Sequence, residues 1–111
     1  MALKLRKNRS APLPAACGGR KALVLLGRAW TLAVVWKLSG GPRRFSELRL
    51  DLPQITPKVL TTRLRELEAE GLVRRTEVAT SPPTVEYALT ELGEALMNPL
   101  EAIVALGLRL G

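Results

Sequence analysis

The sequence predicts a mainly α-helical domain with one small β-hairpin, and three observations support this fold class. Residues 55–70 carry apolar side chains at helical spacing, between a helix-start signal and Gly71. Two strand-like runs, 72–78 and 84–89, follow on either side of a turn with two prolines. Apolar segments at 20–38 and 92–106 have the pattern of buried helices.

The composition indicates one globular domain with a polyanionic partner. The chain has 111 residues and a formal net charge of +7, and its charge is unevenly distributed. Residues 1–75 carry 16 basic and 5 acidic side chains, whereas residues 76–111 carry 1 and 5. A basic body with an acidic C-terminal end favours nucleic acid as the partner of the body. Two apolar runs, 22–38 and 100–110, are too short to span a membrane and are interpreted as buried helices.

The N-terminal residues 1–16 are interpreted as a mobile basic arm, followed by a single domain over residues 17–111. The arm has four cations, no acids and two prolines. It is either a solvated tail or an arm that lies on DNA phosphate or in the minor groove.

Helix-start and helix-stop signals divide the first half of the domain. We expect a helix over 20–26 that ends at Gly27, and a second over 30–38 that ends before the segment 39–42, which contains Gly and Pro. A short extended piece at 43–45 leads to a helix that Ser46 caps and that ends near Leu52.

The helix predicted from Thr56 to Glu70 has two chemically different faces. Thr56 is its expected N-cap, and Pro57 its first residue. One face is apolar: Val59, Leu60, Leu64 and Leu67. The opposite face is polar, with Arg63 on its flank: Lys58, Thr61, Thr62 and Arg65. Because Glu66, Glu68 and Glu70 would repel phosphate, we expect the N-terminal half of the helix to approach DNA.

The second half of the chain adds a hairpin and a long helix. The prolines at 82–83 mark the hairpin tip, and Thr90 caps the C-terminal helix. Pro99 is expected to kink this helix or to break it in two. Its apolar positions exceed what one small domain covers, so we expect it to form a dimer contact.

Four strings in order make the chain resemble the HxlR-type winged helix-turn-helix regulators of bacteria, which are relatives of the MarR-like regulators. The strings are LLGRAWTL, GPRRFSEL, ITPKVLTTRLRELEAEGLV and PPTVEYALTELG. The resemblance implies a winged helix-turn-helix with extra N- and C-terminal dimerisation helices. It further implies a homodimer that binds a near-palindromic double-stranded operator in the cytoplasm, associated with the nucleoid. It also implies that the helix at 56–70 enters the major groove and that the hairpin forms the wing.

The resemblance also assigns site residues. Those carried over as DNA-binding are Arg43, Ser46, Thr56, Lys58, Thr61, Thr62, Arg63 and Arg65. Arg44 joins them as part of the same cationic cluster, and Thr84 as the wing position of the DNA-binding set. The cysteine that some members use as an oxidant or electrophile sensor aligns with Cys17, and neighbouring cations at 20–21 favour its reactive thiolate. The alternative is a small buried residue at a dimer contact.

The chain departs from the family pattern at positions that affect DNA reading. Gln is common in the family where Thr62 stands, and Arg is common on the wing where Thr84 stands. Arg28 and Ala29 replace the usual Gly-Lys before Trp30, and Gly18 replaces a Pro. The operator preference therefore does not transfer.

Other classes of function are weighed against this one. The chain has no His and one Cys, so the usual metal sites and nucleophile–base pairs lack their parts; we expect no enzyme, no metal and no cofactor. A basic RNA-binding domain remains an alternative, although one Tyr and one Phe leave few stacking platforms. A winged-helix protein-interaction module is the other.

Overall fold

The computed structural model describes residues 18–110. The predicted basic arm at 1–16 and the candidate sensor Cys17 lie outside this range. The elements in chain order are α1 (Gly18–Leu26), α2 (Thr31–Leu38), β1 (Arg43–Arg44), α3 (Phe45–Asp51), α4 (Pro57–Ala69), β2 (Val73–Val78), β3 (Thr84–Leu89), α5 (Glu91–Glu94) and α6 (Met97–Gly107). The predicted class, mainly helical with a small hairpin in a winged helix-turn-helix, is confirmed.

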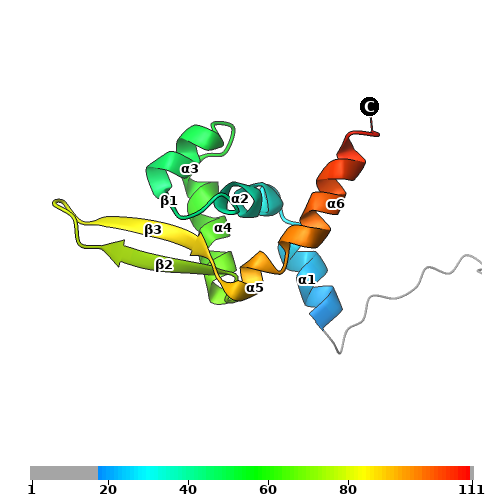
Figure 1. The fold of residues 1–111 in the computed structure, drawn as a ribbon, viewed down its shortest axis with the longest axis horizontal. Helices are drawn as coiled ribbons and strands as arrows, with labels where there is room; N and C mark the ends of the chain where they lie inside the picture. Colours follow the sequence, from blue (N-terminus) through cyan, green and yellow to red (C-terminus); the bar gives the residue numbers. More distant parts are fainter. Residues whose placement is uncertain (1–17, 111) are drawn as a thin grey trace, which may run out of the picture.

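The elements are arranged along one long axis, and different elements form its two ends (Figure 1). The β2–β3 hairpin reaches outward at one end, and α1 and α6 diverge at the other. Helices α2, α3 and α4 lie between them and enclose the core. No helix in residues 18–110 has the length and hydrophobicity needed to cross a membrane.

The core is made mainly of aliphatic side chains from α2, α3 and α4. Leu60, Leu64 and Leu67 of α4 are at most 1% exposed and pack in one cluster with Val34 and Val35 of α2. The cluster also contains Leu48, on the buried side of α3, and Leu52, four residues later at the C-terminal end of that helix. The apolar face predicted for α4 is therefore the face that the protein buries.

The hairpin belongs to a three-stranded antiparallel sheet in the order β1-β3-β2. Tyr87 of β3 is paired with Arg43 of β1 on one side and Arg75 of β2 on the other. Only the base of the hairpin is buried, at the facing pair Val73 and Leu89. The tip is exposed, so the hairpin extends as a wing.

The hairpin base is joined to α5 by a compact set of hydrogen bonds. Gly71 ends α4 with φ of 79°, a conformation that favours glycine. The Thr90 hydroxyl donates to the Gly71 carbonyl at 2.6 Å and accepts from Gly93 N at 3.1 Å. A side chain at Gly93 would collide with the Leu72 carbonyl, so this approach requires glycine. Thr90 is thus confirmed as the cap of the helix after the hairpin.

Two predicted helix starts in the first half were wrong. Helix α3 is capped by Arg44 rather than Ser46, because the Glu47 carboxylate accepts the Arg44 N–H at 2.8 Å, and the helix begins two residues earlier than predicted. Ser46 therefore lies exposed in the first turn. Trp30 does not begin α2 but precedes it with φ of 72°, outside the helical region.

The break predicted at Pro99 is present, but it falls upstream of the proline. Pro99 is the third residue of α6. Ala95 N still donates to the carbonyl of Glu91, four residues earlier, but Leu96 N donates to that of Gly93, only three residues earlier, and α6 begins after it. Proline has no N–H to donate to the carbonyl four residues earlier and its ring crowds that carbonyl. The disruption therefore falls one turn before the proline, and Pro99 sits in the first turn of the new helix, where no N–H is needed.

Candidate nucleic-acid interface

The N-terminal half of α4 exposes the polar face that the sequence predicts. The Thr56 hydroxyl accepts from Val59 N at 3.2 Å, which confirms Thr56 as the cap. Lys58, Thr62 and Arg65 are exposed, and Thr61 is half-buried. The Thr62 hydroxyl donates to the Lys58 carbonyl at 2.9 Å, which leaves its lone pairs available as acceptors. Neither Lys58 nor Arg65 has an ion-pair partner within residues 18–110.

The acidic half of α4 is neutralised from within the protein. Arg28, in the loop between α1 and α2, pairs with Glu66 at 2.7 Å, and Lys21 of α1 pairs with Glu70 at 3.0 Å. Glu66 also accepts from Arg63 at 3.1 Å. Two of the three glutamates that would repel phosphate therefore have cationic partners, which lowers their repulsion. In the sequence, Arg28 stands out only as a departure from the family pattern.

Arg63 is occupied by contacts inside the protein. Its Nε donates to the Ala29 carbonyl at 2.8 Å, and its Nη1 contacts Glu66. The side chain is 18% exposed, on the flank where the helical spacing places it. Arg63 thus holds α4 against the α1–α2 loop, and among the predicted cations it is the one least available to a ligand.

The two arginines of β1 differ in their availability. Arg43 donates to the Pro42 carbonyl at 3.1 Å and lies 4.0 Å from the Asp51 carboxylate. Arg44 is exposed, stands opposite Glu86 in the strand register, and has no ion pair in the described part of the chain. Of the predicted cationic cluster, Arg44, Lys58 and Arg65 are therefore the most accessible members.

The wing tip carries no charge. Residues 79–85 contain no ionisable side chain. The Thr84 hydroxyl lies 3.3 Å from that of Thr80, which donates to the Pro82 carbonyl at 2.7 Å. These contacts shape the turn, and the tip presents hydroxyl and proline groups where a cation would be needed for a strong phosphate contact.

Some exposed cations were not singled out from the sequence. They are Arg49 on α3, and Arg74 and Arg75 on β2. For Arg49, the available signal was its spacing of three residues from Ser46, which puts both on one face of a helix. No three His, Cys, Asp or Glu residues come together within residues 18–110 to form a metal site.

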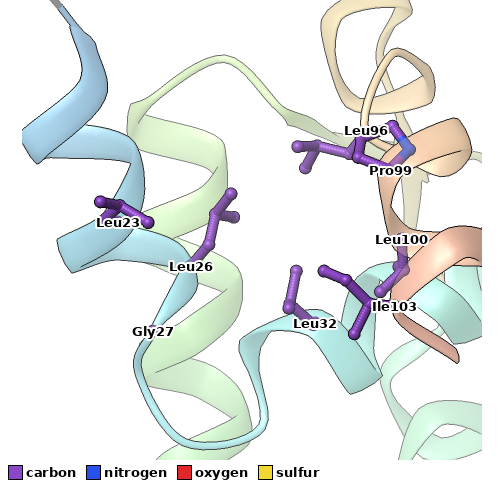
Figure 2. A pocket seen from close by; sticks show the side chains of 8 residues that line it. All are labelled: Leu23, Leu26, Gly27, Leu32, Leu96, Pro99, Leu100 and Ile103. Atoms are coloured by element: carbon purple, nitrogen blue, oxygen red, sulfur yellow. The ribbon is translucent and has the colours of Figure 1, made fainter. Parts of the chain in front are cut away.

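The opposite end of the molecule has an apolar surface. Leu23 of α1 is 57% exposed and Ile103 of α6 is 52% exposed. Both line a cavity of about 280 Å³, in which Leu23 and Leu26 face Leu100 and Ile103 (Figure 2). A second cavity of about 340 Å³ shares Ile103 and extends along α2 to Trp36. Apolar surface on two diverging helices is typical of a protein–protein contact.

Comparisons with known proteins agree on one family. Residues 25–110 match the family model described as HxlR-like helix-turn-helix. The chain is 44% identical over 91 residues to the uncharacterized HTH-type transcriptional regulator YkvN of Bacillus subtilis, covering 82% of this chain and 77% of that one.

Solved structures of transcriptional and redox regulators have the same fold. The oxidised form of the redox regulator HypR matches with a TM-score of 0.80 and 36% identity, over 86% of this chain and 98% of that one. The reduced form of the transcriptional regulator YodB from B. subtilis matches with a TM-score of 0.73 and 37% identity, over 78% and 84%.

The contacts of Arg63 predict a stability difference between two neighbouring arginines of α4. We expect Arg63→Ala to lower the free energy of unfolding by about 1–3 kcal/mol, because the Ala29 carbonyl loses its charged donor and Glu66 loses a partner. Arg65→Ala, at an exposed position without such contacts, should change it by less than about 0.5 kcal/mol. Urea unfolding followed by circular dichroism measures both, and equal effects would contradict the assignment of Arg63.

Proposed function

Because the chain belongs to the HxlR-like helix-turn-helix family of transcriptional regulators, we propose that it binds double-stranded DNA sequence-specifically as a homodimer. The observation that carries the proposal is the division of α4. Its first half exposes Lys58 and Arg65 without ion pairs in the described structure, while its second half has Glu66 and Glu70 held by cations of the body. The helix therefore offers one end to a polyanion.

Each accessible group in this half has a chemical role in the proposal. Lys58 and Arg44 supply phosphate affinity by releasing counterions from DNA. Arg65 reads a guanine edge in the major groove, and the methyl group of Thr61 or Thr62 contacts a thymine methyl. Thr56, whose hydroxyl oxygen already caps α4, retains a proton to donate to a phosphate near the helix N-terminus. The proposed set also includes three contacts to the DNA backbone, which are Ser46 on α3, Arg43 on β1 and Thr84 on the wing.

The homodimer in the proposal uses α1 and α6. Their exposed apolar side chains lie at the end of the molecule away from the hairpin, so joining two copies there leaves both α4 helices accessible. A two-fold dimer matches a near-palindromic operator with half-site centres about 34 Å apart, or a multiple of that distance. Its place of action in the proposal is the bacterial cytoplasm, on the nucleoid.

The proposed effector is an oxidant or an electrophile that acts on Cys17. Solved structures with this fold include a redox regulator in its oxidised form. Since Cys17 is the single cysteine of the chain, its first product with an oxidant is a sulfenic acid, a disulfide to a second chain or a mixed disulfide with a small thiol.

The DNA proposal is tested by Arg65→Ala. On the operator, recovered by footprinting of bound genomic DNA, we expect binding to weaken by about 1–3 kcal/mol in a gel-shift titration. A loss of the same size on every sequence would make Arg65 a phosphate contact. Absence of any duplex binding by the unaltered protein at low salt, or preference for single-stranded RNA, would contradict the proposal.

The dimer is tested by Ile103→Glu, which puts a carboxylate in the middle of the proposed contact. We expect the unaltered protein to sediment with the mass of two chains at micromolar concentration, and Ile103→Glu to sediment as one, because burying an unpaired charge opposes association. Leu50→Glu makes the same change at an exposed leucine of α3 and should remain dimeric. A monomeric unaltered protein would contradict the dimer.

The effector proposal is tested with diamide, a thiol-selective oxidant. We expect diamide to change DNA binding of the unaltered protein and to leave Cys17→Ser unaffected, with reversal by a reductant. Mass spectrometry of the oxidised protein distinguishes a disulfide between two chains from a mixed disulfide. If Cys17→Ser responds as strongly as the unaltered protein, the sensor is elsewhere.

A further inference from the structure

We propose that the groove between α3 and the turn before α4 holds one phosphate of the duplex backbone, with Arg49 as the cation that binds it. This assignment rests on the proposed DNA binding and adds a residue that the family resemblance does not supply. The residues lining the groove are Phe45, Ser46, Arg49, Leu50, Pro53 and Ile55.

The groove lies next to the half of α4 that we propose faces DNA. Its lining begins on the first turn of α3 and ends at Ile55, one residue before the Thr56 cap of α4. Its cavity volume is about 500 Å³, and it is open to solvent along the exposed side chain of Leu50. A strand of DNA whose bases meet the first turns of α4 therefore passes close to the groove.

The charges of α3 are separated onto two sides of the helix. At about 100° per residue, Arg49 and Ser46 lie within about 60° of each other. Glu47 and Asp51, four residues apart, lie together on roughly the opposite side. Both acids are directed to β1: Glu47 accepts from Arg44 N at 2.8 Å, and Asp51 lies 4.0 Å from the Arg43 guanidinium. The groove side of α3 thus combines a cation with a hydroxyl and has no acid.

The side chain of Arg49 has no partner inside the described structure. Its side chain is exposed and makes no hydrogen bond or ion pair with residues 18–110. A guanidinium with a neighbouring hydroxyl suits a phosphate, which accepts two parallel N–H bonds and a further O–H bond. Sugar–phosphate backbone also suits the apolar rim, because Leu50 can contact the deoxyribose while Arg49 meets the charge.

The test compares the salt dependence of binding to a random-sequence duplex of about 30 base pairs, because a phosphate contact carries no sequence information. Arg49→Gln keeps most of the side chain and removes its charge. We expect the slope of log affinity against log salt, between about 50 and about 200 mM, to fall by about 0.9 for each bound chain. Arg49→Lys, which restores the charge, should restore most of the slope.

A matched control removes the same charge elsewhere. Arg109 is exposed and follows α6 by two residues. Helix α6 lies at the end of the molecule away from the hairpin (Figure 1). Arg109→Gln changes the net charge by the same amount as Arg49→Gln, so it reports the effect of overall charge alone. We expect its salt slope to equal that of the unaltered protein, with both variants unfolding at the same temperature as the unaltered protein.

The outcomes separate this assignment from the DNA proposal on which it rests. If the unaltered protein binds no duplex, the proposed function fails. If it binds and Arg65→Ala weakens binding, but Arg49→Gln and Arg109→Gln have equal slopes, only the phosphate groove is overturned, and the groove is then free for another acidic ligand such as a peptide. A loss that depends on the DNA sequence would also overturn it, since it would place Arg49 on a base edge.

Discussion

The burial of Leu60, Leu64 and Leu67 determines how α4 is turned about its own axis. Each is at most 1% exposed, and full burial of a leucine side chain contributes about 1.5–3 kcal/mol. Turning the helix by half a turn would expose these three side chains and place Lys58 and Arg65 in an apolar core without partners, which is strongly unfavourable. The outward position of every group proposed to read DNA on α4 follows from this one packing constraint.

Electrostatic contacts then distinguish the two halves of the same helix. Arg28 and Lys21 reach Glu66 and Glu70 from the α1 end of the molecule, and Arg63 joins the Arg28–Glu66 pair. Partly exposed ion pairs are individually weak, so their importance here lies in position more than in stability. They offset negative charge on the proposed DNA-reading helix and connect it physically to the helix proposed for dimerisation. A displacement of α1 relative to α4 would have to stretch or break them.

The two ends of the molecule are suited to different partners. At one end, α3, β1 and the first half of α4 present Arg44, Arg49, Lys58 and Arg65 without ion pairs in the described range. At the other end, α1 and α6 present leucine, isoleucine and valine around two cavities. Figure 2 shows the first of these cavities. Because the cationic and apolar surfaces are kept apart, the proposed DNA contact and the proposed dimer contact do not compete. The tip of the wing carries no charge, so in the proposed complex the phosphate contacts come from the helices and the strands more than from the tip.

The sequence by itself determined the order of the elements, the limits and cap of α4, the hairpin and the family, because periodicity, caps and turn residues act over short distances along the chain. It did not determine the cap of α3. The Glu47 carboxylate accepts the N–H of Arg44, three residues earlier, and this contact sets the start of the helix. Only the tertiary structure decided that Arg63 bonds to groups within the protein and that Arg49 has no internal partner in the described chain. The contact between Arg63 and Ala29 joins residues 34 positions apart. Which cations are occupied and which remain accessible depends on such long-range neighbours, and no local pattern in the sequence specifies them.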